Sequence, residues 1–507
     1  MSNLDGSWPR RQGCLIVLRA KATEDAVLEE LQQQPYILLR LAENAMSVAQ
    51  SLRNNYFANT AKFVSHLRAA NARDKAGNRI LEVFDVPQTS WADLQDEVVT
   101  FIDGGVGSVQ IASQVPLLLR VGSYCVRTGE RRLAQREQFG YYPVILGDLE
   151  GGSRDRKDFI DIVRITAELL GGLSALERTP DLRALMFHGP LVYLVGSYAG
   201  HSPFTEHDID LFLRQYAVDV SIGRKLKAEF LENARVNVYP KMEQPRWAER
   251  RVFEPLAWMA FLYQKLVATA KARIPRTLVM GVVERGGELK EFSERVLLER
   301  VFDRLRADRR ESYFNEQYGR TDLLSPRALL DRLGYTDALL LAMILEPGQY
   351  SEPWEVAKYE GLRRGDVVVP GDAERVTVNF RPLRPPGPWG FPEVTATYVQ
   401  ILKNAEPLRV ELFTELGAEQ VSEAVRRIVL YSKLLPGYGF PVGLDVADKY
   451  AKVPAWMTNA YGKLIRHHLG VSLQKGEITD AEIRRLLTQA IYMTHRDWLF
   501  RPTASSQ

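Results

Sequence analysis

Apolar residues recur along this chain at two spacings, and each spacing predicts a different kind of element. Between residues 21 and about 85 they recur at helical intervals, as at Val64 and Leu67, so we expect helices there. From Val98 onward, short continuous apolar runs become common, which is typical of buried strands. The chain is therefore expected to begin with a helical N-terminal arm, residues 1–95, that serves in dimerisation or docking.

Strand-like and helix-like segments alternate after this arm. Strands are expected at 98–102, 115–121, 124–126, 185–195, 277–283, 376–380, 395–402 and 408–412, and helices at 155–177 and 290–306. Residues 204–270 are mainly helical and arginine-rich, and we interpret them as a helical insertion. The alternation predicts an α/β fold with a mixed sheet, formed by residues 96–455, and a C-terminal helical extension over residues 456–507.

One carboxylate lies at the end of the first expected strand. Asp103 follows Phe101-Ile102 and precedes three glycines and a serine, which we expect to turn the backbone tightly and to admit a ligand. A strand, an aspartate, a glycine turn and two further strands form the opening of a ribonuclease-H-like nuclease core. A strand followed by Asp-Gly-Gly is also a common structural device, so a metal site at Asp103 needs support from elsewhere in the chain.

Two further side chains are candidates for the same site. Glu168 shares a helical stripe with Asp161 and Arg164, so it either projects towards a metal site or pairs with a nearby arginine as an exposed carboxylate. His188 interrupts an apolar strand just before a glycine and a proline. A lone histidine on such a strand is more often a core residue, but its position at a strand end favours contact with a ligand.

Length and composition narrow the classes of protein that remain. The 507 residues suffice for two to four domains or for one large core with insertions. A composition of 46% apolar and 25% charged residues is ordinary for a soluble globular protein. Two distant cysteines, Cys14 and Cys125, indicate neither a disulfide framework nor a zinc cluster and favour a reducing, cytoplasmic setting. The chain has no apolar run of about 18 residues, so we expect no membrane span.

The charge balance is close to neutral, with 66 lysines and arginines against 63 acidic residues. Arginine beside an aromatic residue, as at Arg246-Trp247, suits phosphate and unstacked bases, which favours a nucleic-acid partner. A solvated surface with ordinary salt bridges explains the same composition, so both interpretations stay open.

A nucleotidyltransferase is one alternative. Gly196-Ser197, followed by Asp208 and Asp210, matches the Gly-Ser and Asp-x-Asp pattern that holds a triphosphate and magnesium in such enzymes. These enzymes also need a third carboxylate on a later strand, and the strand expected at 234–239 carries none. This alternative requires nucleotide incorporation that Asp208→Ala abolishes and Asp103→Ala does not.

Taken in order, the segments of residues 95–455 resemble the NurA family of DNA-end-processing nucleases, partners of the HerA hexameric ATPase. The resemblance is carried by Phe101–Gly105, the helix bearing Glu168, Phe187–Leu191, Thr277–Val283, Asp337–Ser351, Leu408–Leu412 and Gly437–Asp448. It implies a ribonuclease-H-like core, cleavage of DNA ends or single strands with Mn2+ (or Mg2+), a homodimer, and docking onto a HerA-type translocase. The implied role is DNA repair or anti-phage defence.

The resemblance also implies a site. Its metal ligands would be Asp103, Glu168, His188 and Asp448, and Tyr438 would hold the phosphate or the metal-bound water. The family has an aspartate where this chain has His188, and a histidine where this chain has Asp448. We hypothesise that the two changes compensate and that the enzyme is an active deoxyribonuclease of the two-metal type. The alternative is a non-catalytic, dimeric DNA-guiding subunit of a HerA-type motor.

Overall fold

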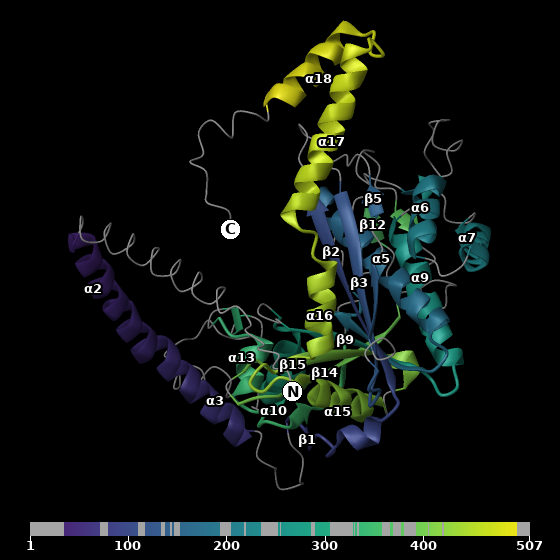
Figure 1. Ribbon diagram of the computed structural model, residues 1–507. Coiled ribbons are helices and arrows are strands. Elements are labelled where there is room, and N and C mark those ends of the chain that lie inside the picture. Colours follow the sequence, from purple (N-terminus) through teal and green to yellow (C-terminus); the bar gives the residue numbers. More distant parts are fainter. Residues whose placement is uncertain are drawn as a thin grey trace, which may run out of the picture. The chain divides into compact units, whose positions relative to one another are not determined.

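The computed structural model describes residues 35–70, 80–109, 117–132, 137–141, 144–146, 153–192, 204–216, 220–234, 252–253, 255–284, 289–304, 328, 330–331, 334–356, 366–368, 377–379, 392–403, 405–417 and 420–493 (Figure 1). Its contacts divide the chain into two units, residues 1–80 with 297–335, and residues 81–296 with 336–507. Arg246-Trp247, Gly196-Ser197 and Cys14 lie outside the described residues.

The first unit is helical where it is described. It contains α2 (Pro35–Ser51), a π-helical turn over Leu52–Phe57, α3 (Ala58–Ala70) and α10 (Glu299–Arg304). Tyr335 packs against Phe63 and Tyr56, with ring centroids 5.2 and 6.2 Å apart. The helices expected in this stretch are present, but residues 83–85 form a strand of the second unit instead of a helix. The domain boundaries at residues 95 and 455 stay a prediction.

The second unit is built on a mixed sheet of 11 strands, which confirms the α/β class. Along the sheet the order is β1 (Val83–Asp85), β10 (Gln349–Ser351), β14 (Val394–Val399), β15 (Leu408–Phe413), β9 (Leu278–Val283), β6 (Leu182–His188), β2 (Val98–Ser108), β3 (Leu117–Arg127) and β4 (Glu137–Tyr141). β11 (Trp354–Glu355) pairs with β14, and β5 (Val144–Leu146) with β3. β2, β6 and β9 are parallel neighbours and β2 to β4 are antiparallel, an arrangement compatible with a ribonuclease-H-like core.

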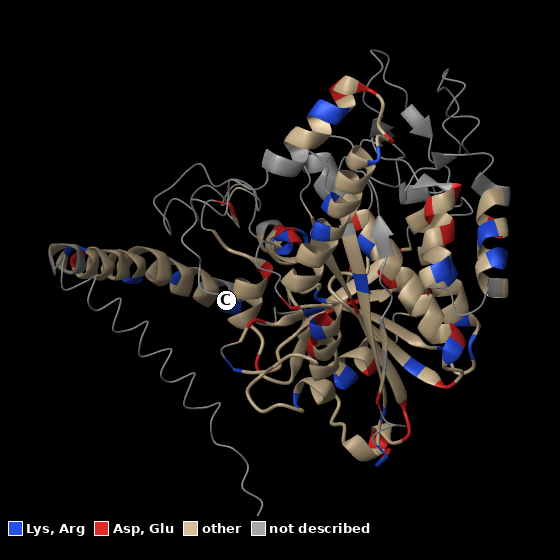
Figure 2. Ribbon diagram, turned by 45° about the horizontal axis from the view of Figure 1, so that its top comes forward, with Lys and Arg blue, Asp and Glu red and all other residues tan. Residues whose placement is uncertain are grey.

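Two strand pairs and a set of helices complete this unit. The pairs are β7 (Phe204–Thr205) with β8 (Val252–Phe253), and β12 (Asp366–Val368) with β13 (Thr377–Asn379). The helices are α5 (Ser153–Arg178), α6 (Glu206–Tyr216), α7 (Val220–Ala234), α9 (Pro255–Ala272), α13 (Asp337–Ala342), α15 (Val421–Ser432), α16 (Val442–Ala451), α17 (Ala455–Gln474) and α18 (Ala481–Met493). Basic and acidic residues are interspersed along them (Figure 2). No described helix has the length and apolarity needed to cross a membrane.

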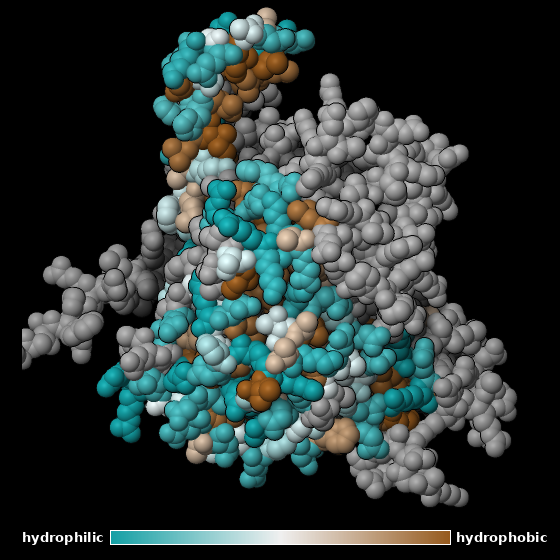
Figure 3. Space-filling model, turned by 90° about the vertical axis from the view of Figure 1, so that its right-hand side faces the viewer, coloured by the Kyte–Doolittle hydropathy of each residue, from teal (hydrophilic) through white to brown (hydrophobic). Residues whose placement is uncertain are grey.

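Helices cover both faces of the sheet around β2. Residues 101, 103 and 105 face α16, which crosses β2 and β3 in Figure 1, because side chains alternate between the faces of a strand. Ile102 faces α5 on the opposite side, where it lies near Gly171. The strands in the middle of the sheet are therefore buried on both sides, which explains their continuous apolar runs. Apolar side chains of α17 and α18, among them Leu464 and Leu486, are exposed (Figure 3).

The glycines after Asp103 do not form the expected turn. β2 continues through Gly104, Gly105 and Gly107, and it pairs with β3 as far as Ser108. A Cβ atom on Gly105 would lie 2.1 Å from the carbonyl oxygen of Ala451. The glycines were expected to form a tight turn and to admit a ligand. In the structure they instead let helix α16 approach the strand closely. Likewise, the two strands expected at 115–121 and 124–126 are the single strand β3.

Gly105→Ala is therefore expected to destabilise the second unit by about 1–3 kcal/mol, because a backbone carbonyl cannot rotate away from the added methyl group. Gly470→Ala in α17 is the matched control. Nothing lies within 4 Å of its added Cβ, so it should stabilise by about 0.5–1 kcal/mol. Urea unfolding of the two variants measures both values, and equal stability would show that α16 does not pack this closely on β2.

Candidate metal centre

Three side chains lie near the carboxyl ends of adjacent parallel strands. Asp103 is on β2 just past its last pair with β6, Ile102 with Phe187, and His188 ends β6. Glu284 follows β9 directly. Because parallel strands present their carboxyl ends at one edge of a sheet, these polar groups come together there.

Helix α16 brings a second carboxylate to the same place. Its backbone lies against two glycines of the sheet, Gly105 and Gly122, so the helix can approach β2 closely. Asp448 thereby joins Asp103 and His188, and one ligand atom from each of the three lies within 4.8 Å of the others. Two carboxylates and an imidazole are a donor set that fits a divalent cation such as manganese.

Asp103 and His188 hold each other in place. One carboxylate oxygen, Oδ1, accepts a hydrogen bond of 2.8 Å from the backbone amide of Gly104. The other, Oδ2, lies 3.1 Å from Nδ1 of His188, and Nε2 of the same ring lies 3.8 Å from Glu284. Burial alone would lower the pKa of His188, but the hydrogen bond to Asp103 and the charges of Asp103, Asp448 and Glu284 raise it. A bound cation must displace this proton, because only neutral imidazole is a ligand.

Glu168 lies beside this group, next to Gly104 of β2. It is buried on α5 and forms a 2.5 Å ion pair with Arg164. A Cβ atom on Gly104 would lie 2.3 Å from its Oε1, so the glycine makes room for the carboxylate. Burial raises the pKa of Glu168 to about 7, opposed by Arg164 and assisted by the charge of Asp103. Glu168 thus has the expected arginine partner, yet it is buried and electrostatically coupled to Asp103.

Glu168 predicts a pH-dependent stability of the metal-free protein. The pKa of Glu168 is about 7 in the folded protein and ordinarily 4.5. Its contribution to the free energy of unfolding is therefore fully present below pH 4.5 and is lost as the pH rises through about 7. The loss is on the order of 3 kcal/mol. Urea unfolding in EDTA, compared between the protein and Glu168→Gln, measures this difference. Parallel pH profiles of the two proteins would contradict it.

Tyr438 lies outside the group of three ligands. Its side chain is 42% exposed, and burial together with a hydrogen bond to Asp445 raises its pKa to about 12. Asp448 and Glu284 also contribute to this rise. Because Asp445 lies three residues before Asp448 on α16, its hydrogen bond with Tyr438 holds the phenol at the rim of the acidic group. Lys452 pairs with Asp448 at 2.6 Å and is largely exposed, so it can meet an approaching phosphate.

Glu284 and the pair Arg409–Glu411 were not among the site residues predicted from the sequence. Glu284 had one usable signal, its position directly after an apolar strand parallel to β6. Glu411 is buried on β15, accepts a 2.8 Å hydrogen bond from the amide of Leu191 and a 2.7 Å bond from Nε of Arg409. Glu411, held by Arg409, thus anchors the backbone at Leu191, three residues after His188, and so helps to fix the position of His188.

Glu411→Gln is expected to destabilise the protein by about 1–3 kcal/mol, because it leaves the buried guanidinium of Arg409 without its closest charged partner. The matched control is Glu423→Gln, whose side chain is 47% exposed and whose loss should cost about 0–1 kcal/mol. Thermal unfolding separates the two values. A cost at Glu411 no larger than the control would rule out its anchoring role.

The structure does not support the nucleotidyltransferase alternative. Asp208 and Asp210 lie on helix α6, not on a strand, and residues two apart point to different sides of a helix. Asp210 forms a 2.7 Å ion pair with Lys227. The two carboxylates are therefore not arranged as a paired magnesium site.

Comparisons with known proteins match a family model and several solved structures. The family model of the NurA domain matches residues 97–453. The crystal structure of the NurA nuclease from Sulfolobus solfataricus aligns with 14% identity and a TM-score of 0.42, over 85% of this chain and 97% of that one. A NurA structure bound to dAMP and manganese aligns with 15% identity and a TM-score of 0.27, over 84% and 93% of the two chains. A search of curated proteins finds no match.

Proposed function

This chain belongs to the NurA family, and from that premise we propose that it is a manganese-dependent deoxyribonuclease acting at Asp103, His188 and Asp448. The observation that carries the proposal is the convergence of these three ligand atoms within 4.8 Å at the carboxyl edge of the sheet. Related structures contain manganese, in one case together with dAMP, which supports both the metal and the nucleotide substrate. Magnesium is the second candidate, but the nitrogen of His188 suits manganese better.

Each side chain has a distinct task in this proposal. Asp103 and Asp448 supply negative charge for a divalent ion, and the Gly104 amide fixes one Asp103 oxygen. A divalent ion bound there would stabilise the charge that develops on the phosphate as water attacks. Glu168, beside Asp103 and held by Arg164, would complete a two-metal site. With its pKa near 7, its carboxylate can also accept a proton at neutral pH.

The surroundings of the site suit a polyanionic substrate. Lys449 on α16 and Lys452 just after its end are exposed, one and four residues after Asp448, where they can contact the DNA backbone. Tyr438 at the rim would bind a substrate phosphate through its hydroxyl. By family membership we further propose that the enzyme processes DNA ends or single strands as a cytoplasmic homodimer with a HerA-type ATPase, in repair or anti-phage defence.

The test is cleavage of end-labelled single-stranded DNA by the purified protein. We expect degradation with Mn2+, weaker degradation with Mg2+, and none with EDTA. Intact DNA under all three conditions, with or without a HerA-type partner, would instead favour a non-catalytic DNA-guiding subunit. Nucleotide incorporation dependent on Asp208 would favour the nucleotidyltransferase.

A further inference from the structure

A pocket of about 560 Å³ lies on the same face of the sheet as the candidate metal centre, outside its ligands. Four aromatic side chains line it, Trp91, Phe101, Tyr124 and Tyr431. Trp91 and Leu434 are 40% and 47% exposed and form its mouth, whereas Phe101 and Tyr431 are buried at its floor. A volume of this size accommodates a small planar ligand.

The aromatic rings form a pocket that no side chain of the described residues fills. Phe101 stacks on Tyr124 with a centroid distance of 6.0 Å, and Tyr431 meets Phe101 edge-on at 5.4 Å. Trp91 meets Tyr431 edge-on from the mouth at 5.3 Å. The hydroxyl of Tyr431, whose side chain is only 3% exposed, has no hydrogen-bond partner among the described residues.

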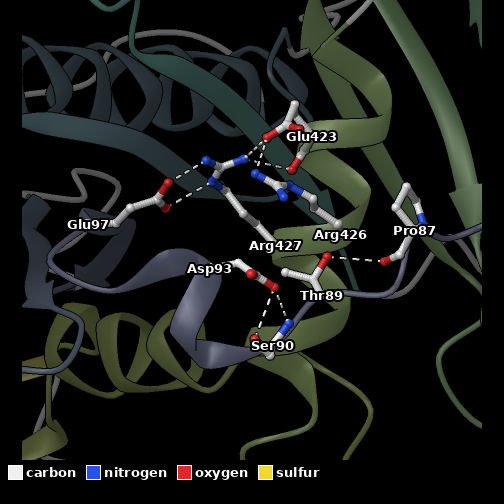
Figure 4. Close-up of polar contacts among 8 residues, drawn as sticks. All are labelled: Pro87, Thr89, Ser90, Asp93, Glu97, Glu423, Arg426 and Arg427. Atoms are coloured by element: carbon white, nitrogen blue, oxygen red, sulfur yellow. Dashed lines mark hydrogen bonds and ion pairs between the residues drawn. The ribbon is translucent and has the colours of Figure 1, made fainter.

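Polar contacts connect the segments that carry Trp91 and Tyr431 (Figure 4). The turn that carries Trp91 is capped by Ser90 and Asp93, whose backbone amide and carboxylate lie 2.7 Å apart. Just after this turn, Glu97 binds Arg427 at 2.6 Å, and Arg427 precedes Tyr431 by one turn of α15. The pocket is therefore formed before any ligand binds, which reduces the entropy cost of binding.

The charges around the pocket exclude an anionic ligand from its interior. Arg127 lines it but is paired with Asp181, and Arg427 is paired with Glu97 and Glu423. Glu137 adds a further negative charge to the lining. Among the described residues that line the pocket, Arg127 is the cation, and its pairing with Asp181 leaves it less able to bind a phosphate group. The lining instead suits a neutral, planar, aromatic group that carries hydrogen-bonding atoms on its edge.

We propose that the pocket binds an unstacked base of the DNA strand whose backbone lies at the metal centre, an inference that rests on the proposed function. Phe101 precedes Asp103 by two residues on the same face of β2, about 7 Å along the strand. Gly443, which also lines the pocket, precedes Asp448 by five residues of α16, about 7 Å along the helix. One DNA strand can therefore reach both sites, with its phosphates outside the pocket.

Binding of a labelled oligothymidylate in EDTA, followed by fluorescence anisotropy, tests this site without cleavage. Trp91→Ala removes one wall, and Ala92→Trp fills the mouth without removing a contact; each should weaken binding about 10-fold or more. Trp456→Ala is the matched control, because this tryptophan of α17 is 68% exposed and does not line the pocket. It should leave binding unchanged, and thermal unfolding verifies that all three variants are folded.

A scan of abasic positions supplies the decisive comparison. In the protein, loss of one particular base should weaken binding, and the same loss should have no further effect in Trp91→Ala. Equal DNA binding by the protein and both pocket variants would overturn the proposal. That result is expected if the pocket instead receives an apolar side chain of a protein partner. Failure to cleave DNA with Mn2+ while the pocket dependence persists would contradict the nuclease function and leave the base site standing.

Discussion

Asp103→Asn is expected to lower manganese-dependent cleavage at least about 100-fold. Replacing a residue that merely supports a metal ligand costs about 10–100-fold, so loss of a ligand charge should reach the upper end of that range. Asparagine has nearly the size of aspartate, and its side-chain oxygen can still accept the 2.8 Å hydrogen bond that the backbone N–H of Gly104 donates to Asp103. The variant should therefore fold, and initial rates on labelled single-stranded DNA measure the loss.

Asp208→Asn is the matched control for this prediction. Asp208 is an aspartate of α6 that belongs to the nucleotidyltransferase pattern and not to the group around Asp103. Its replacement should leave the cleavage rate unchanged. Cleavage that survives Asp103→Asn, or that depends on Asp208 instead, would refute the assignment of the site.

Exchanging His188 and Asp448 is expected to show strong coupling between the two positions. His188→Asp alone places three carboxylates together, and Asp448→His alone leaves one carboxylate with two imidazoles. Each single change should reduce cleavage about 10–100-fold, the range observed when a metal environment is altered. The double change restores one imidazole and two carboxylates within the same 4.8 Å group, so it should recover most of the activity.

The coupling is measured as the departure of the double variant from the product of the two single effects. Independent effects, with the double variant worse than either single, would show that the two residues do not share one ion. The compensation hypothesis would then be wrong, and His188 would act only as a partner of Asp103 and Glu284.

Much of the fold follows from local patterns, because its central strands are buried on both faces. The apolar runs of β9, β14 and β15 were recognisable for this reason. Helix α5 was recognisable from the helical spacing of its apolar residues. The glycines of β2 were misread because a glycine gives the same sequence signal in a turn and under a helix. Only the contact of Gly105 with Ala451, more than 300 residues away in the chain, distinguishes the two cases.

The candidate site was predictable in part. Asp103, His188 and Asp448 were named from the order of segments, and the structure brings their ligand atoms together. The structure does not bring Tyr438 into that group, and sequence order could not show that Asp445 binds it. Glu284 was missed because a single carboxylate after a strand gains meaning only when the neighbouring strand is known to be β6.

The most direct test of the account is whether the nitrogen of His188 binds manganese. Electron spin-echo envelope modulation of the Mn2+-loaded protein detects coupling between the ion and a directly bound imidazole nitrogen. We predict this coupling in the protein, its loss in His188→Gln, and its persistence in His467→Gln, which alters a histidine of α17. Coupling that is absent from the protein, or that survives in His188→Gln, would contradict a manganese site built from Asp103, His188 and Asp448.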